Sequence, residues 1–199
     1  MSIVTADLTT SADGFGAAAD QTLEHPFGSI DQSRMHGWMF DHAEDNADEV
    51  AGILDAGAFV MGRNMFSPDR GPWDLAWRGW WGEEPPYRAP VFVLTHHERE
   101  PLEMSGGTTF HFVTDGPAAA LERAREAAGE RNVSIAGGAG TVNTYLAAGA
   151  IDELRVHVAP FVSGLTTGSR LFAGLPALDL VPVSARSTPY VTHLVYGRA

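Results

Sequence analysis

The chain has 199 residues, a length that fits one domain spanning residues 1–199, and 44% of its residues are hydrophobic, enough for a full core. The formal net charge of -12 argues against nucleic acid or an anionic membrane as a partner. All 13 basic residues are arginine and cysteine is absent, which excludes Schiff-base lysines, Walker-A loops, thiolate nucleophiles and disulfides.

The N-terminus reads MSIVTADLTTSADG and has neither the basic region nor the continuous apolar region of a secretion signal. No apolar run in the chain approaches the roughly 20 residues that a membrane span needs. We therefore expect a soluble, cytoplasmic protein.

Strand and helix patterns alternate along the chain. Strands are expected at residues 3–8, 58–61, 91–95, 109–113, 133–136 and 154–159. Helices are expected at residues 31–41, 45–56, 116–128 and 140–148. This alternation is typical of βαβ units around a mostly parallel sheet, and so predicts an α/β fold.

The C-terminal region has a different pattern. Residues 178–185 and 191–196 are two strand-like segments on either side of Ser187-Thr188-Pro189. Turn residues between two such segments are typical of an antiparallel hairpin. We therefore expect an antiparallel edge on the otherwise parallel sheet.

Residues 67–90 show no clear period and contain the tryptophans Trp73, Trp77, Trp80 and Trp81. A loop of this length inside a domain is usually functional or contacts a partner. The tryptophans could stack on a flat substrate or lie in a contact between subunits.

The segment VSIAGGAGTVNTYLAAG, residues 133–149, is a strand followed by a glycine pair and a helix. The first backbone N–H groups of a helix have no partner within the helix, and glycines allow an anionic group to come close to them. Gly137 and Gly138 could therefore bind a phosphate group, or could simply permit a tight turn and close packing of helix on sheet.

Four stretches in order resemble the dihydrofolate reductase-like family, in particular the branch related to the reductase domain of the bifunctional riboflavin-biosynthesis deaminase/reductase. They are TSADGFGA at residues 10–17, FVMGRNMF at 59–66, PVFVLTHH at 90–97, and the glycine-pair segment continued through AIDELRVHVAPFVSG and RLF to residue 172. The resemblance implies a three-layer fold with a mostly parallel sheet, an antiparallel C-terminal hairpin and helices on both faces. It also implies NADPH across the carboxyl ends of the strands and a homodimer.

The resemblance assigns cofactor contacts to three segments. The residues expected to bind NADPH are Gly62, Arg63, Asn64, Leu94, Thr95, His96, Ala136, Gly137, Gly138, Ala139, Gly140 and Thr141. Arg63 is placed for the 2′-phosphate, because a planar guanidinium with several donors suits that group. A surface arginine paired with an acidic neighbour is the alternative interpretation. Met65 stands where many relatives have a phosphate-binding threonine.

Two residues are candidates for assisting proton transfer. Asp13, in the turn after the first strand, resembles the family aspartate near the nicotinamide, although an Asp-Gly turn can also use aspartate to cap its own backbone. His36 could replace the helix carboxylate with which dihydrofolate reductases bind the pterin, since Met35 falls at about that position. His36 could equally be a half-buried structural histidine.

Four residues are expected to contact the substrate: Met35, Trp38, Trp73 and His157. For His157 a satisfied core position is an equal alternative. A metal site at His96 and His97 is disfavoured, because adjacent strand residues point to opposite faces of the sheet.

The resulting hypothesis is an NADPH-dependent reductase that transfers a hydride to a small heterocyclic or carbonyl compound. It resembles the 5-amino-6-(5-phosphoribosylamino)uracil reductase of riboflavin biosynthesis. The alternative is a non-catalytic dinucleotide- or small-molecule-binding protein on the same fold. No metal, nucleic acid or membrane partner is expected.

Overall fold

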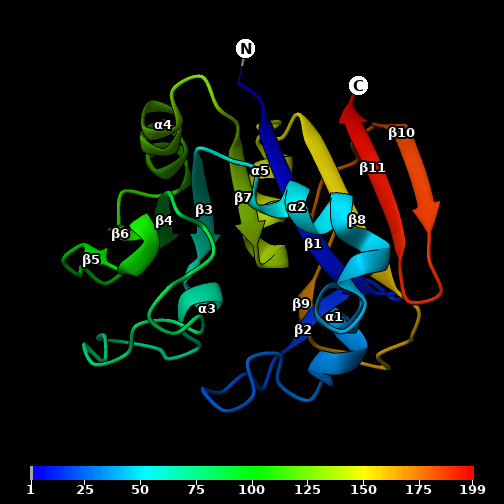
Figure 1. Ribbon diagram of the computed structural model, residues 1–199, viewed down its shortest axis with the longest axis horizontal. Coiled ribbons are helices and arrows are strands. Elements are labelled where there is room, and N and C mark those ends of the chain that lie inside the picture. Colours follow the sequence, from blue (N-terminus) through cyan, green and yellow to red (C-terminus); the bar gives the residue numbers. More distant parts are fainter. Residues whose placement is uncertain (1) are drawn as a thin grey trace.

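The computed structural model describes residues 2–199, and within that range nine strands form one sheet in the order β10-β11-β8-β1-β7-β3-β4-β6-β5. The neighbouring parallel strands are β8 (Glu153–Ala159), β1 (Val4–Ser11), β7 (Val133–Gly137), β3 (Ala58–Gly62), β4 (Pro90–Leu94) and β6 (Thr109–Val113). The antiparallel edges are β10 (Leu180–Ser187) with β11 (Thr192–Arg198), and β5 (Leu102–Glu103). The predicted α/β fold, with its mostly parallel sheet and C-terminal hairpin, is confirmed (Figure 1).

One face of the sheet packs against two helices, α4 (Pro117–Ala128) and α5 (Ala139–Ala147). Alternate residues of β1, namely Val4, Ala6 and Leu8, are buried in this cluster. Side chains alternate between the faces of a strand, so Asp7 and its polar neighbours along β1 lie on the other face.

The other face is covered in two different ways. Over β3, β4 and β6 lies an aromatic cluster that includes Phe59, Phe66 and Phe110, all fully buried. The irregular segment 67–90 packs onto this cluster through its tryptophans, instead of standing clear of the domain. Trp73 Nε1 donates to the carbonyl of His97 at 2.8 Å, and Trp77 Nε1 donates to the carbonyl of Phe66 at 2.7 Å. We refer to this region as the aromatic half.

Over β11, β8 and β1 the same face is covered by α1 (Gln32–Phe40), a 3₁₀ turn η1 (Ala43–Asn46) and α2 (Ala47–Leu54). Figure 1 shows α1 and α2 lying across these strands, with the hairpin of β10 and β11 at the sheet edge. We refer to this region as the polar half, because Asp7, His157 and His193 are buried in it. With helices on both faces, the three-layer arrangement is as predicted.

The helix predicted at residues 45–56 is wrong in its first part, where η1 and then α2 replace one continuous helix. The backbone of Asn46 is not helical, with φ -131° and ψ 26°. Its side-chain amide donates instead to the carbonyls of Trp38 and His42, at 3.0 and 2.8 Å. This local bonding competes with the helical ladder and breaks the helix at Asn46.

A second, smaller sheet was not predicted. It pairs β2 (Phe15–Ala18) with β9 (Gly168–Arg170) in antiparallel fashion near the carboxyl end of β1. A single helical turn, α3 (Arg63–Phe66), was also missed and directly follows β3. The second sheet contacts α5 through β9, and α3 stands at the carboxyl end of β3.

Candidate functional site

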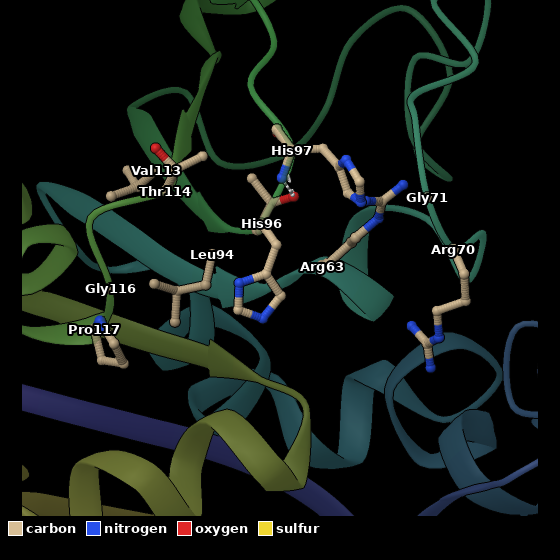
Figure 2. A pocket seen from close by; sticks show the side chains of 11 residues that line it. Arg63, Arg70, Gly71, Leu94, His96, His97, Val113, Thr114, Gly116 and Pro117 are labelled. Carbon is tan, nitrogen blue, oxygen red and sulfur yellow. Dashed lines mark hydrogen bonds between the residues drawn. The ribbon is translucent and has the colours of Figure 1, made fainter.

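A pocket opens where β4 and β6 end, beside the start of α3. The residues that line it are Arg63, Arg70, Gly71, Leu94, Thr95, His96, His97, Val113, Thr114, Gly116 and Pro117. Figure 2 shows Arg63 and Arg70 on one side of this pocket and Gly116 and Pro117 on the other, with His96 between them. Four of the residues predicted to bind the cofactor, Arg63, Leu94, Thr95 and His96, therefore come together here.

The pocket is suited to an anion. Its lining contains two arginines and two histidines but not one carboxylate. Helix α4 begins at the pocket, and its N-cap residue Gly116 gives no side-chain hydrogen bond to the helix. The unpaired N–H groups at a helix start carry a partial positive charge, which adds to that of the arginines.

Arg63 has the features of a ligand-binding arginine. Its guanidinium lies over the ring of Trp73, 3.8 Å from the centroid, which fixes its plane. Its Nε and Nη2 atoms are buried, and among residues 2–199 they have no hydrogen-bond partner. Burial lowers the pKa of Arg63, and the positive charge of Arg70 lowers it further. Oriented, unsatisfied guanidinium donors fit a phosphate group, so the residues present suit the 2′-phosphate predicted here.

The contact with Arg63 places Trp73 beside the predicted cofactor pocket. The contact of Trp73 with a substrate stays a prediction. Asn64 bonds to its neighbours, accepting from Arg70 Nη1 and donating to Gln21 Oε1 at 2.9 Å.

The glycine pair lies at the junction of β7 and α5. Gly137 has φ +105°, in the left-handed region that disfavours a side chain, and Gly138 caps α5 without a side-chain hydrogen bond. A Cβ at Gly62 would collide with Oγ1 of Thr141. The end of β3 and the start of α5 are therefore in direct contact, so the predicted segment 136–141 adjoins Gly62 and Arg63.

The hydrogen bonds of Asp13 oppose its predicted role in proton transfer. Its carboxylate accepts from Ser11 Oγ at 2.6 Å, from Ser163 N and Oγ at 2.9 and 2.8 Å, and from Gly164 N at 3.2 Å. Partial burial by itself would raise the pKa of Asp13, but the bonds from Ser11 and Ser163 outweigh it and hold the pKa well below its ordinary value. Asp13 is thus a fixed anion that ties the turn after β1 to residues 163–164.

The residues predicted on α1 are more buried than a substrate contact requires. Met35 is 0% exposed and packs with Phe15, Ala18 and Ile30, so the prediction that it contacts substrate is not supported. Trp38 is also buried, and its ring lies over His157 with 4.7 Å between centroids.

His36 packs against Phe27, with ring centroids 4.7 Å apart. Burial, together with the positive charge of His157, lowers the pKa of His36 to about 4. The ring is therefore neutral near pH 7 and is a poor proton donor, which favours the structural alternative.

His157 belongs to a buried polar cluster formed by Asp7, His157, His193 and Asn46. His157 Nδ1 lies 2.7 Å from His193 Nδ1, and His193 Nε2 lies 2.9 Å from Asn46 Oδ1. On its other side His157 Nε2 is 3.5 Å from Asp7 Oδ1. His157 is a core residue, but it is not the fully hydrogen-bonded core histidine of the alternative interpretation. Its Nε2 atom has no hydrogen bond within the described chain. Its contact with a substrate stays a prediction.

Sequence reasoning did not single out Asp7, Asn46 or His193. The pattern of β1 contains a signal for Asp7, since polar Thr5, Asp7 and Thr9 alternate with apolar residues in a strand that is buried on both faces. His193 and Asn46 come together with Asp7 only through the tertiary fold.

Two further features bear on function. Residues 2–199 include no helix that is long and apolar enough to cross a membrane. Over the same range no three acidic or histidine side chains are grouped as metal ligands would be.

A family model and several solved structures match nearly all of the chain. The family model described as the RibD C-terminal domain matches residues 2–193. A search of curated proteins found no match. Among solved structures, a putative riboflavin biosynthesis protein from Shewanella sp. PV-4 is similar, with a TM-score of 0.60, 22% identity and 99% of each chain covered.

Two other structures share the fold. A pyrimidine reductase-like protein from Corynebacterium diphtheriae has a TM-score of 0.56 and 15% identity, with 98% of this chain and 91% of that chain covered. A diaminohydroxyphosphoribosylaminopyrimidine deaminase/5-amino-6-(5-phosphoribosylamino)uracil reductase from Thermotoga maritima has a TM-score of 0.59 and 14% identity. All of this chain is covered in that match, but only 57% of the Thermotoga protein.

Proposed function

The chain belongs to the RibD C-terminal domain family, and we propose that it is an NADPH-dependent reductase that transfers a hydride to a small heterocyclic or carbonyl substrate. The single observation that carries the cofactor assignment is Arg63, held flat by Trp73 with two buried, unpartnered donor atoms among the described residues. A monophosphate on the adenosine ribose offers the oxygens that these donors lack.

The rest of the binding site follows from the same geometry. Thr95 and His96 are assigned to the ribose and its phosphate, because they line the pocket next to Arg63. The start of α5 after Gly138 is assigned to the pyrophosphate, because its first N–H groups are free of a side-chain cap. When the dinucleotide is bound, its reduced nicotinamide supplies the hydride. The protein positions the two rings and provides a proton.

A phosphorylated substrate would need an arginine side chain to receive its phosphate group. Arg78 and Arg88 pair with Glu83 and Glu84, and Arg70 bonds to Asn64 in the cofactor pocket. Arg34, on α1, lies over the ring of Phe161 at 4.4 Å and is exposed. Arg34 is therefore our candidate for a substrate phosphate.

Oxidation of NADPH in the presence of 5-amino-6-(5-phosphoribosylamino)uracil, followed by the loss of reduced nicotinamide absorbance, tests this proposal. The same uracil without its phosphate is the matched control, and Arg34→Ala is the matched variant. Turnover with either compound supports a reductase, and loss of the preference for the phosphorylated compound in Arg34→Ala supports the phosphate contact. Tight NADPH binding without oxidation by these or other heterocyclic and carbonyl compounds would favour the non-catalytic binding protein.

A further inference from the structure

The aromatic half contains a second arginine, Arg99, which does not line the cofactor pocket. Its guanidinium lies among three aromatic rings, with Cζ 5.5 Å from the ring centroid of Phe66, 5.6 Å from that of Trp73 and 5.1 Å from that of Phe112. Its Nη1 atom is buried and has no hydrogen-bond partner among residues 2–199. Burial of part of a charged group is costly, so the position of Arg99 requires an explanation.

Arg99 bonds to the backbone of the tryptophan-rich segment. Its Nη2 atom donates to the carbonyl of Trp77 at 2.8 Å and to that of Leu75 at 3.3 Å. Both carbonyls belong to a short turn, in which the N–H of Trp77 donates to the carbonyl of Asp74. Residues 67–89 form neither a strand nor a long helix, so side-chain bonds of this kind determine where the segment lies.

An ion pair does not explain Arg99. The sequence has 25 acidic residues, but among the described residues no carboxylate forms a salt bridge with Arg99 or with Arg63. Burial and the positive charge of Arg78 lower the pKa of Arg99, and the negative charge of Asp74 opposes them only in part. The hydrogen bonds that Arg99 makes in the described chain therefore serve to hold the turn of residues 74–77.

Trp73 connects this turn with the cofactor pocket. The Arg63 guanidinium lies 3.8 Å from the centroid of the Trp73 ring, and Trp73 Nε1 donates to the carbonyl of His97 at 2.8 Å. Arg63 and His97 both line the pocket. Trp73 comes directly before the turn that Arg99 holds, and its ring contacts the Arg99 guanidinium. The plane of Arg63 therefore depends on a segment that is fastened by Arg99.

We propose that Arg99 is a positioning residue for the cofactor pocket, which fastens residues 73–77 so that the Trp73 ring directs the Arg63 guanidinium towards a phosphate group. This inference rests on the proposed function, because the phosphate is that of the cofactor. Arg99 itself makes no contact with the nucleotide. Its planar guanidinium bonds two carbonyls while it lies against aromatic rings, a combination that the compact, strongly hydrated ammonium of lysine does not reproduce.

Calorimetric titration with adenosine 2′,5′-bisphosphate and with adenosine 5′-monophosphate tests this role without any turnover, because the two compounds differ only in the 2′-phosphate. The wild type is expected to prefer the bisphosphate by about 10- to 100-fold, the range of charge-assisted hydrogen bonds to one phosphate. Arg99→Met should reduce this preference by about tenfold and leave the affinity for the monophosphate unchanged. A general loss of structure would instead weaken the binding of both compounds.

Arg198→Met is the matched control. Arg198 is exposed at the end of β11 and donates through Nη1 to the carbonyl of Gly149 at 2.8 Å, so this variant removes the same charge and a similar bond. It should keep the wild-type preference. Arg99→Lys keeps the charge and should still lose the preference. An unchanged preference in Arg99→Met would overturn the proposal. A wild-type preference in Arg99→Lys, beside a loss in Arg99→Met, would assign the effect to charge alone and would also overturn it.

Hydrogen exchange of the wild type keeps the test decisive if the Arg99 variants do not fold. Saturation with the bisphosphate should slow the exchange of the amides of residues 73–77 more than saturation with the monophosphate, because a phosphate that orders Arg63 also orders Trp73 and the segment behind it. Equal exchange in the two complexes would overturn the positioning role alone. Equal affinity of the wild type for the two compounds would refute the 2′-phosphate assignment of the proposed function, and the positioning role with it.

Discussion

Over β3, β4 and β6 one face of the sheet is covered by aromatic rings. Over β11, β8 and β1 the same face is covered by helices, and aspartate, histidine and asparagine side chains are buried in that region. In the aromatic half the indole N–H groups of Trp73 and Trp77 are bonded to carbonyls. In the polar half Trp38 Nε1 has no partner among the described residues, and neither do the oxygens of Asp7. The difference indicates that the aromatic half stabilises the domain and holds Arg63 in place, while the polar half buries titratable groups whose hydrogen bonding is incomplete among the described residues.

Phe110→Ala should have the largest effect on stability. Phe110 is fully buried at the centre of the aromatic half and packs edge-on against Phe66 at 5.0 Å. Truncation of a buried phenylalanine leaves a cavity, so we expect a loss of about 3–5 kcal/mol in the free energy of unfolding. Urea unfolding followed by tryptophan fluorescence measures it. A loss below about 1 kcal/mol would mean that the aromatic half does not carry the stability assigned to it.

Acidification should distinguish the two halves. Burial, and the charge of His157, lower the pKa of His36 and of His193 to about 4 from an ordinary value of 6.5. The unfolded chain therefore binds more protons than the folded chain between these values. Stability should fall as the pH drops from 6.5 towards 4, by up to about 3 kcal/mol for each histidine. Asp13 has a lowered pKa, and its contribution would be lost only below its ordinary value of 3.8.

Urea unfolding at a series of pH values checks this prediction with a variant in each half. His193→Gln should make the decline with acidity clearly shallower. Phe110→Leu should lower stability by a similar amount at every pH in this range. The same acid dependence in His193→Gln and the wild type would contradict the assignment of the decline to the polar half.

Asp13→Ala should have a smaller effect on the free energy of unfolding. It also tests whether Asp13 is a structural or a catalytic carboxylate. The substitution removes the acceptor for Ser163 and Gly164, and we expect a loss of about 1–3 kcal/mol in unfolding free energy. Because Asp13 is a fixed anion, the pH profile of NADPH oxidation should keep its shape. A profile that loses one titration in Asp13→Ala, with little change in stability, would restore the sequence-based assignment of Asp13 to proton transfer.

The fold could be predicted because its main features are local. The alternation of strand and helix patterns indicated the parallel sheet, and the turn at Ser187-Thr188-Pro189 indicated the hairpin. The second sheet was missed because β9 has only three residues and pairs with β2, which is about 150 residues away in the chain. The break in the helix at Asn46 depends on side-chain bonds to Trp38 and His42, which a periodic pattern does not contain.

Site residues that belong to short sequence motifs could be predicted, whereas roles that depend on tertiary contacts could not. Arg63 follows β3 directly and His96 comes two residues after β4, and parallel strands bring such positions to one edge, where the structure places them in one pocket. The roles proposed for Asp13 and His36 depended on hydrogen bonds and burial that the sequence does not show. The polar cluster joins residues from β1, η1, β8 and β11, and none of its partners is near another in the chain.

A titration of the protein with NADPH and with NADH, following the fluorescence of Trp73 and its neighbours, tests whether Arg63 binds the 2′-phosphate. The wild type is expected to bind NADPH about 10- to 100-fold more tightly than NADH, the range that charge-assisted hydrogen bonds to one phosphate supply. Arg63→Ala should weaken NADPH binding to the NADH value, while Arg131→Ala, at an exposed ion pair, should change neither. Equal affinity for the two nucleotides in the wild type, or NADPH binding that Arg63→Ala leaves intact, would contradict the account.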